Sequence, residues 1–246
     1  MVEEDNNKNE FSKFFVSTDY IKLKNQLFNY RFRKFMLAKV YNKYSKKSEK
    51  ILDVGCGISP VSPVKSKTVF IDSDKNAMNI LKKLGYKTRL GDVEKIHAKN
   101  ESVNAVFSSE VLEHVRNYKK SIKEFARVLK KSGVLFLTVP THMTYWAFDD
   151  DYVGHLRRFD PRKLAKEIGD EGFEILENRP IGSFLERELT KFLVKRAINQ
   201  KPMKISKLKM EGFKIINDFL FGIIYLAYLL NNSKNSSIVM IVARKK

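Results

Sequence analysis

The stretch Lys50-Ile51-Leu52-Asp53-Val54-Gly55-Cys56-Gly57 is a short apolar run that ends in two glycines. Glycine has no Cβ, so its backbone adopts conformations closed to other residues and lies close to bound ligands. A second apolar run over 68–71 ends in Asp72, about twenty residues after Asp53. In an open α/β sheet, a carboxylate at that distance accepts hydrogen bonds from ribose hydroxyls. The two runs therefore predict a site for a nucleoside-containing cofactor.

Two other nucleotide-binding motifs are disfavoured by the same residues. A dinucleotide-binding loop has a small residue at the sixth position of its glycine motif, where this chain has Pro60. A phosphate-binding loop of the G-x-x-x-x-G-K-[ST] type does not occur in the sequence. NAD as cofactor and the hydrolysis of ATP or GTP are therefore not expected.

Short apolar runs alternate with segments of helical periodicity. The runs predict strands at 50–54, 68–71, 87–90, 103–108, 133–139 and 173–177, with helices between them. Gly133 predicts the end of the helix that carries Phe125, Val128 and Leu129. This alternation is typical of an α/β fold in which helices cover both faces of a parallel sheet.

Five segments, in this order, resemble the motifs of the class I S-adenosylmethionine-dependent methyltransferases, within the group that includes the quinone-biosynthesis methyltransferases. They are Ile51–Gly57, Phe70–Ser73, Gly91–Glu94, Ser108–Val115 and Leu129–Pro140. A sixth segment, Gly154–Phe159, is similar to one found in many relatives of this group. Two departures, Val103-Asn104 in place of Phe-Asp and Ser59 in place of a third glycine, remove no group that must contact the cofactor.

The resemblance implies a Rossmann-like, doubly wound fold with a mostly parallel seven-stranded sheet. The last run, 237–243, would then be an antiparallel strand beside the fifth. We expect a single domain, because only one set of motifs occurs in 246 residues. Its expected parts are a disordered tail (1–10), an N-terminal cap helix (11–48), a cofactor-binding core (49–180), a helical insertion (181–233) and the last strand (234–246).

The resemblance also implies S-adenosyl-L-methionine as cofactor and names the residues that hold it. Asp53 and the glycine loop would hold the methionine part, Asp72 the ribose, and the other residues the adenine edge and the cofactor floor. The implied residues are Asp53, Gly55, Cys56, Gly57, Asp72, Ser73, Asp92, Val93, Ser109 and Glu110. The methyl group is already activated by the sulfonium, so the protein mainly positions the reactants and removes a proton where the acceptor is a hydroxyl or amine.

The acceptor side is predicted in an aromatic and charged stretch between 145 and 158. We predict His155 as the catalytic residue, because imidazole titrates at about pH 6.5 and accepts a proton at neutral pH. The predicted acceptor contacts are Tyr145, Trp146, Tyr152 and Arg158. In the alternative, His155 and the arginines only anchor the loop that enters a helix at Asp160-Pro161. His114 is assigned to packing, and no metal site is expected.

The net charge of +19 is distributed unevenly. Residues 11–50 hold 11 basic and 2 acidic residues and residues 191–246 hold 12 and 2, whereas residues 51–190 hold 23 and 20. Both basic flanks are also apolar, with aromatic residues at helical spacing in the first and an apolar run over 219–230 in the second. That run of twelve residues would reach only ~18 Å as a helix, so it is not expected to span a membrane.

Three interpretations of these flanks stay open. Their helices pack on the sheet with lysines that only solvate the outer faces, or they serve a lipid-like acceptor at an anionic membrane surface. Binding of nucleic acid is the third and is disfavoured, because the aromatic residues have the spacing of a helical core. The N-terminus has no apolar secretory segment and Cys56 is the only cysteine, so a cytoplasmic protein, peripheral at the inner membrane surface, is expected.

The sequence thus predicts a methyltransferase for a small apolar or amphiphilic acceptor, by O- or C-methylation. The alternatives are a non-catalytic cofactor-binding partner subunit and a methyltransferase that acts on nucleic acid or protein. Oligomeric state is not predicted.

Overall fold

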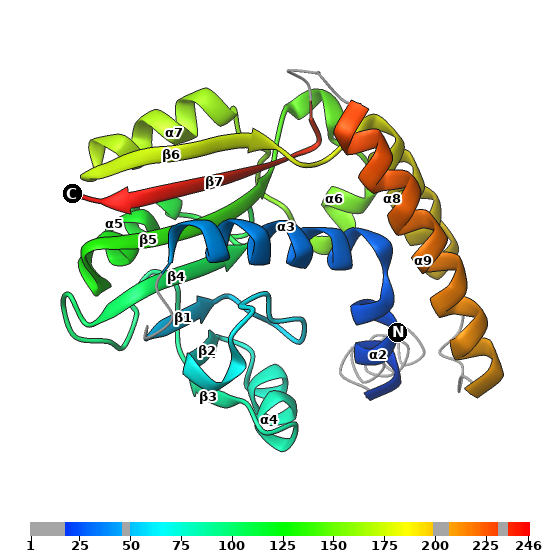
Figure 1. The fold of residues 1–246 in the computed structure, drawn as a ribbon, viewed down its shortest axis with the longest axis horizontal. Helices are drawn as coiled ribbons and strands as arrows, with labels where there is room; N and C mark the ends of the chain where they lie inside the picture. Colours follow the sequence, from blue (N-terminus) through cyan, green and yellow to red (C-terminus); the bar gives the residue numbers. More distant parts are fainter. Residues whose placement is uncertain (1–17, 46–49, 199–206, 231–235) are drawn as a thin grey trace, which may run out of the picture.

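The computed structural model describes residues 18–45, 50–198, 207–230 and 236–246; the expected tail over 1–10 lies outside them. Its centre is a seven-stranded sheet with the strand order β3-β2-β1-β4-β5-β7-β6 (Figure 1). The strands are β1 (Ile51–Val54), β2 (Thr68–Asp72), β3 (Lys87–Leu90), β4 (Val103–Ser109), β5 (Leu129–Pro140), β6 (Phe173–Pro180) and β7 (Ile238–Lys245). Strands β1 to β5 pair in parallel, and β7 lies antiparallel between β5 and β6. The predicted Rossmann-like fold with an antiparallel last strand beside the fifth is confirmed.

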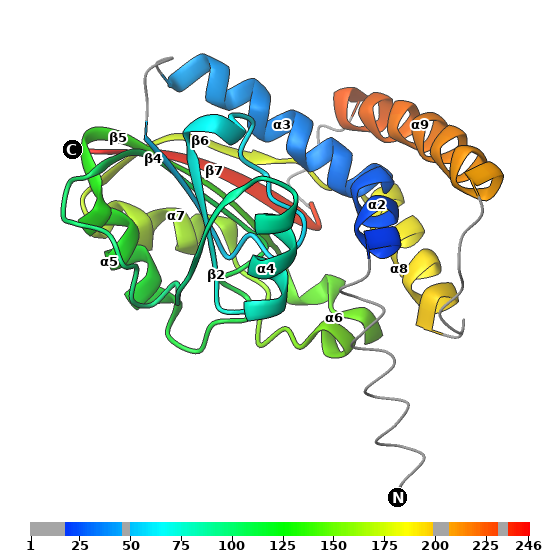
Figure 2. The same cartoon turned by 90° about the horizontal axis from the view of Figure 1, so that it is seen from below.

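Helices cover both faces of this sheet (Figure 2). They are α2 (Thr18–Gln26), α3 (Phe28–Tyr44), α4 (Lys75–Lys83), α5 (Tyr118–Val128), α6 (Phe148–Val153), α7 (Pro161–Asp170), α8 (Phe184–Ile198) and α9 (Lys207–Leu230), with 3-10 turns η1 (Lys65–Lys67) and η2 (Met143–Tyr145). Helices α5 and α7 pack on one face, and α3 packs on the other. Helices α2, α6, α8 and α9 gather beyond the carboxyl ends of the parallel strands, where open α/β sheets bind ligands (Figure 1).

The core is built from alternate residues of the central strands. Leu135 and Leu137 face α5 and α7, whereas Phe136 faces α3 and stacks on Phe107 with ring centroids 4.7 Å apart. These side chains are fully buried, and burial of each contributes about 1.5–3 kcal/mol to stability. The strands are therefore fixed firmly enough to position the loops at their ends.

The two basic flanks pack against each other. Phe32 and Phe35 of α3 contact Phe221 and Tyr225 of α9, with ring centroids 5.7–6.5 Å apart. The side chain of Asn217, which is 2% exposed, accepts a hydrogen bond from the backbone N–H of Phe28 at 2.9 Å, at the start of α3. The flanks thus form one helical layer.

The structure differs from the sequence-based expectations in two local details. Where one cap helix is expected over 11–48, the described residues form α2 and α3, because Leu27 leaves the helical conformation at ψ 132°. Gly133 does not end a helix: α5 ends at Val128, and Leu129 is already extended and paired with Val103 in β5. A Cβ on Gly133 would lie 2.8 Å from the Lys130 carbonyl oxygen, so close backbone packing accounts for this glycine.

The expectation that the last apolar run is too short to span a membrane is wrong as regards length. The run is the second half of α9, whose segment Lys209–Leu230 has 22 residues and contains an 18-residue stretch with a mean hydropathy of 1.6. By length and composition alone, this helix is suited to crossing a membrane. In the fold, however, its Asn217 face is held against α3, as described above.

Candidate cofactor and acceptor site

The predicted cofactor loops meet at one edge of the sheet because they follow parallel neighbouring strands. Gly55 N–H donates to the Ile71 carbonyl at 2.8 Å, and Gly57 N–H donates to Asp72 Oδ2 at 2.7 Å. Gly91 N–H donates to the Asp72 carbonyl at 3.0 Å. Asp72 therefore links the glycine loop after β1 to the loop after β3, and its contact with the ribose stays a prediction.

Gly55 and Gly57 both have a positive φ, of 74° and 49°. A Cβ on Gly55 would also lie 2.4 Å from a methyl carbon of Val111, whereas a Cβ on Gly57 would meet nothing within 4 Å. Gly55 thus allows the loop to pack against the segment after β4. Gly57 leaves open space in front of the backbone, where a ligand can approach.

Asp53 and Cys56 lie beneath this loop. Asp53 is 1% exposed, and its Oδ2 accepts hydrogen bonds from the N–H groups of Val61 and Ser62 at 2.7 and 2.8 Å. Burial raises the pKa of Asp53 to about 6, although these hydrogen bonds oppose the shift. Burial also raises the pKa of the Cys56 thiol, which is therefore no nucleophile. Both side chains support the loop, and their direct contact with the cofactor stays a prediction.

The adenine-side residues are more open. Ser73 and Asp92 are exposed, and Val93 packs partly against the core. Asp92 Oδ1 accepts a hydrogen bond from Glu94 N–H at 2.7 Å, which fixes the turn after β3. These residues lie next to Asp72, where the adenine edge is predicted.

The predicted cofactor floor, Ser109 and Glu110, lies at the end of β4. Ser109 Oγ and Thr138 Oγ1 are 2.7 Å apart, and Glu110 N–H donates to the Thr138 carbonyl at 2.9 Å. Glu110 has a φ of 55°, a conformation unfavourable for a non-glycine residue, and its Oε2 lies 3.9 Å from Nη2 of the buried Arg33. Strained residues of this kind are concentrated at functional sites.

His155 is paired with Asp150, a residue that the sequence analysis did not single out. His155 Nδ1 lies 2.6 Å from Asp150 Oδ1, and the backbone N–H of His155 donates to the Asp150 carbonyl at 2.9 Å. Desolvation would raise the pKa of Asp150, but hydrogen bonds from His155 and Arg158 lower it to about 2. The ionised Asp150 holds the proton of His155 on Nδ1, so Nε2 is left as a proton acceptor.

The remaining predicted acceptor residues are divided between the interior and the surface. Arg158 is 8% exposed; its Nε and Nη2 donate to Asp150 at 2.9 and 3.0 Å. It therefore anchors the loop, as the alternative interpretation holds, and its contact with an acceptor stays a prediction. Trp146 Nε1 donates a hydrogen bond to Asp151 at 3.2 Å. The Tyr145 carbonyl accepts one from Arg187, and the Tyr152 side chain is exposed.

Three residues missed by sequence reasoning complete this network. Arg187 of α8 donates to Asp149 and, at 2.9 Å, to Asp150, which ties the helical insertion to the acceptor segment. Glu113 is fully buried, and its burial, together with the nearby Glu110, raises its pKa well above the ordinary value. The three consecutive aspartates at 149–151 next to His155 were the available signal for Asp150. No sequence signal pointed to Arg187, because its partners are 37 and 38 residues away.

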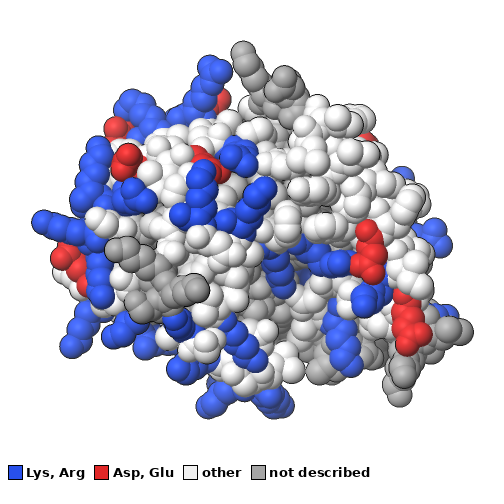
Figure 3. Space-filling model, in the orientation of Figure 1, with Lys and Arg blue, Asp and Glu red and all other residues white. Residues whose placement is uncertain are grey.

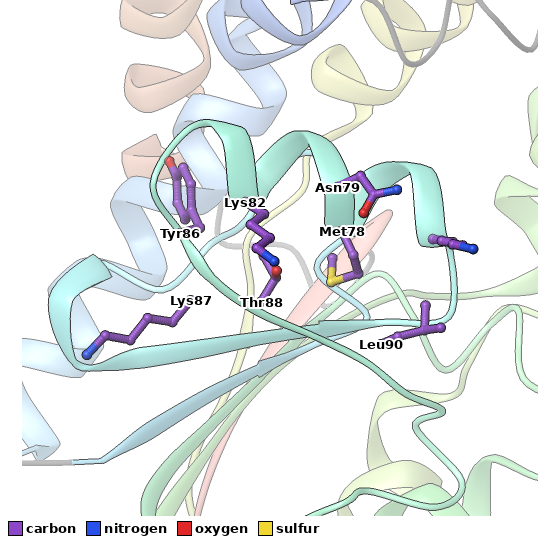
Figure 4. A pocket seen from close by; sticks show the side chains of 8 residues that line it. Met78, Asn79, Lys82, Tyr86, Lys87, Thr88 and Leu90 are labelled. Atoms are coloured by element: carbon purple, nitrogen blue, oxygen red, sulfur yellow. The ribbon is translucent and has the colours of Figure 1, made fainter.

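Two surface hollows occur among the described residues, and only one of them adjoins the predicted site. One of about 450 Å³ lies between α4 and β3 and is lined by Met78, Lys82 and Tyr86 (Figure 4). None of the predicted cofactor residues lines it. The other, of about 520 Å³, is lined by His142, Arg157, Arg158 and Phe159 at the acceptor segment. The second hollow is the one that adjoins the predicted acceptor side.

Several known proteins that resemble this chain are methyltransferases. A ubiquinone/menaquinone biosynthesis C-methyltransferase, UbiE, of Campylobacter jejuni is 26% identical over 211 residues, 78% of this chain and 82% of that protein. A probable S-adenosylmethionine-dependent methyltransferase of Mycobacterium tuberculosis is 24% identical over 59% of this chain, and the match spans 56% of that relative's length.

A solved structure from Thermotoga maritima has the same fold. It is an S-adenosylmethionine-dependent methyltransferase, possibly acting on histamine, and it aligns with a TM-score of 0.60 over 97% of this chain and 95% of its own, at 15% identity. A family model described as a methyltransferase domain matches residues 24–178, more than half of the chain. Together with the glycine loop and Asp72, these matches show that the chain belongs to the class I S-adenosylmethionine-dependent methyltransferases.

Proposed function

We propose that this protein transfers the methyl group of S-adenosylmethionine to a small apolar or amphiphilic acceptor, at an oxygen or carbon atom. The observation that carries the proposal is the continuity of the site along the strand edge. The Asp72–Gly57 pair lies at its cofactor end, and the Asp150–His155 pair lies at the other. The segment after β4 connects the two ends, since Val111 packs against Gly55 and Glu113 Oε1 lies 3.8 Å from His155 Nε2.

In this proposal the protein orients the acceptor and removes a proton from it. The His155 Nε2, held by Asp150, deprotonates or orients the acceptor, a contribution of roughly 10²–10⁴ in rate. Alignment of the acceptor with the methyl group contributes more, because well-oriented reactions gain about 7–11 kcal/mol.

The apolar character of the acceptor is supported by helix α9. Its outer face exposes Ile215, Phe219, Leu226 and Leu230, which recur at helical spacing on the side opposite Asn217. Phe219, Leu226 and Leu230 are 70%, 57% and 75% exposed. Figure 3 shows a largely uncharged surface over the second half of α9. An apolar face of this size on the helical layer next to the site fits an amphiphilic acceptor or the membrane that holds it.

We further propose that α9 lies flat in an anionic membrane surface rather than across the membrane. A spanning position would separate Asn217 and Asp218 from Phe28 and Arg31, their partners on α3. The exposed Lys195, Arg196 and Lys214 on α8 and α9 suit an anionic surface, where each cation contributes about 1 kcal/mol. The proposed location is therefore cytoplasmic and peripheral, on the inner membrane surface.

The UbiE relative supports a quinone-like acceptor class, because its name places it in ubiquinone and menaquinone biosynthesis.

Two other functions compete with this proposal: a cofactor-binding partner subunit without turnover, and methylation of nucleic acid or protein. The intact cofactor loops and the His155–Asp150 pair favour an enzyme. The exposed apolar face of α9 favours a lipid-like acceptor over nucleic acid.

Labelled methyl transfer tests the acceptor class. The full chain is incubated with methyl-labelled S-adenosylmethionine and a cell extract, and label is measured in the solvent-soluble lipid, small-metabolite, protein and nucleic-acid fractions. We expect label in the lipid or apolar metabolite fraction, and none with Asp72→Asn as control. Label confined to protein or nucleic acid contradicts the acceptor class. Cofactor binding without label in any fraction would support the partner-subunit alternative.

Vesicle sedimentation tests the membrane location. We expect the protein to pellet with anionic vesicles and less so in high salt, because exposed charges are screened within ~8–10 Å at physiological ionic strength. Phe219→Asp or Leu226→Asp should abolish pelleting while circular dichroism stays unchanged. Leu84→Asp, at a 46% exposed leucine after α4, is the matched control and should have no effect. Wild-type protein that stays in solution with both neutral and anionic vesicles refutes the membrane location.

A further inference from the structure

The carboxylate of Glu113 is fully buried, and neither of its oxygens has a hydrogen-bond partner among the described residues. Burial of a carboxyl group without a partner is unfavourable, so such a group in a folded protein calls for an explanation. The Glu113 segment is well held, because its carbonyl accepts a hydrogen bond from Leu156 N–H at 2.8 Å. The fold therefore holds both carboxylate oxygens in a buried position where no described residue donates a hydrogen bond to them.

Two imidazole rings lie beside this carboxylate. His155 Nε2 is 3.8 Å from Glu113 Oε1, and the ring centroids of His114 and His155 are 4.7 Å apart. One ligand atom from each of the three residues lies within 4.8 Å of the other two. Nδ1 of His155 is bonded to Asp150 at 2.6 Å, and Nδ1 of His114 lies 3.3 Å from the Gly154 carbonyl oxygen. These bonds leave Nε2 of each ring for a further ligand.

We propose that Glu113, His114 and His155 bind a divalent first-row transition-metal ion such as Zn²⁺, Co²⁺ or Mn²⁺. Two imidazoles and one carboxylate suit these ions better than Mg²⁺ or Ca²⁺, which prefer oxygen ligands. Asp150 is the carboxylate that orients the His155 ring, an arrangement found at most metal-binding histidines. The site is thus assembled from ligands and from the groups that orient them.

The ligand atoms must move toward one another to close around an ion. Bonds of about 2.0–2.2 Å at tetrahedral angles place two ligand atoms about 3.3–3.6 Å apart, so a separation of 4.8 Å must shorten by about 1.2–1.5 Å. His114 is exposed, and the one side-chain hydrogen bond it makes to the described residues is the long one to Gly154, so its ring can shift toward the other two ligands.

Glu110 places this cluster at the border of the predicted cofactor site. Its charge acts on both Glu113 and His114, and its Oε1 is buried without a hydrogen-bond partner. Glu110 also follows β4 directly, where the cofactor floor is predicted. An ion at the cluster therefore lies between the cofactor floor and the acceptor segment.

This placement, which rests on the proposed methyl transfer, gives the ion a chemical role. Three protein ligands leave coordination positions open, and a hydroxyl group bound to a divalent ion is much more acidic than in water. The acceptor O–H bond breaks and its proton passes to solvent. The acceptor oxygen then bonds to the methyl carbon as the carbon–sulfur bond breaks, and S-adenosylhomocysteine leaves. His155 is a ligand in this scheme, and O-methylation is favoured over C-methylation.

Cobalt binding tests the site without reference to activity. Untagged full-length protein is treated with a chelator and titrated with Co²⁺, followed by visible absorption and calorimetry. We expect one ion per chain, with binding weakened at least about tenfold in His114→Ala and about 10–100-fold in Asp150→Asn. His97→Ala is the matched control, since His97 is exposed on the loop after β3, and it should bind like the wild type.

Absence of saturable Co²⁺ binding, or equal binding by His114→Ala and the wild type, would overturn the metal site. A second measurement separates this proposal from the methyl-transfer function. Label transfer to a hydroxylated acceptor that is undiminished after chelation contradicts the role of the ion and leaves the methyltransferase function intact. Metal-loaded protein that binds S-adenosylmethionine but transfers no label to any fraction contradicts the function and leaves the metal site intact.

Discussion

The middle of strand β5 and the outer face of α9 are both apolar runs in the sequence, but they have opposite surroundings. Leu135, Phe136 and Leu137 are 0% exposed between two helical layers, whereas Phe219 is 70% and Leu226 57% exposed. The charges are divided in the same way. Basic and acidic residues are nearly equal in number in the sheet region, whereas the flanks are strongly basic. The sheet thus encloses its apolar residues, whereas the flanks bury one side of α3 and α9 and leave the outer face of α9 exposed, with cations nearby.

The comparison suggests a division of labour. The sheet positions the predicted cofactor loops, and in the proposed function the helical layer determines what reaches them. Residues 145–158 lie at the border between the two, tied to the sheet through Glu113 and to α8 through Arg187. Substitutions at the cofactor edge, at this border and in the helical layer should therefore have distinct effects.

The largest effect is expected at the border. His155→Ala should lower the methylation rate by ~10²–10⁴ while the affinity for S-adenosylmethionine is unchanged, because His155 acts on the acceptor. Single-turnover kinetics and calorimetric titration measure the two quantities. Turnover close to that of the wild type would reduce His155 to an anchor of the loop, as the alternative interpretation of this segment holds.

The next largest effect is expected at the cofactor edge of the sheet. Asp72→Ala should weaken S-adenosylmethionine binding by ~2–4 kcal/mol, because it removes charge-assisted hydrogen bonds to the ribose as well as the bond to Gly57. Calorimetry gives the affinity, and circular dichroism should show a folded protein. Wild-type protein that binds NAD but not S-adenosylmethionine would contradict the cofactor assignment itself.

The free energy of unfolding is expected to change with pH by roughly 3 kcal/mol through the buried Asp53 of β1. Burial raises the pKa of Asp53 from 3.8 to about 6, so the folded state binds the proton more tightly than the unfolded chain. The contribution of Asp53 to stability is fully present below about pH 4 and is lost as the pH rises to about 6. Asp53→Asn keeps an oxygen for Val61 and Ser62 and removes this dependence. Urea unfolding of both proteins between pH 4 and 7 measures it; parallel curves would show that Asp53 does not titrate in this range.

The glycine loop offers a matched pair of substitutions. Gly55→Ala and Gly57→Ala both force alanine into a positive φ, which costs about 1 kcal/mol or slightly more. Only Gly55→Ala also brings a Cβ against Val111, so it should destabilise the protein by a further ~1–3 kcal/mol. Thermal unfolding compares the two variants, and Val111→Ala should restore part of the loss. Equal effects would show that the loop moves aside.

The smallest effect is expected in the helical layer. Asn217→Ala should destabilise the protein by about 1–2 kcal/mol, because the Phe28 N–H at the start of α3 loses its partner. Lys214→Ala, at an exposed position on the same helix, is the control and should have little effect. Both are measured by urea unfolding. A negligible effect of Asn217→Ala would mean that α9 is held by its other contacts with α3, the aromatic ones and the Arg31–Asp218 pair.

The sequence by itself determined the sheet and the cofactor edge. Apolar runs separated by helical periodicity are local patterns, and the glycines at 55 and 57 and Asp72 follow their strands directly. Because parallel strands end at the same edge, correct strand positions were sufficient to bring these residues together. Family resemblance then supplied the antiparallel strand β7, which the structure confirms.

Only the tertiary structure decided the acceptor side and the role of the flanks. Asp150 pairs with His155 across a helix end, Arg187 reaches both Asp149 and Asp150 from another helix, and Glu113 faces His155 from a different loop. Arg187 and Glu113 lie 37 or more positions away from these partners, and no local pattern encodes their contacts. The buried side of α9 likewise depends on α3, some 190 residues earlier, through the bond between Phe28 and Asn217. Apolar periodicity indicates that a helix has a face to cover, but the partner that covers it is chosen by packing.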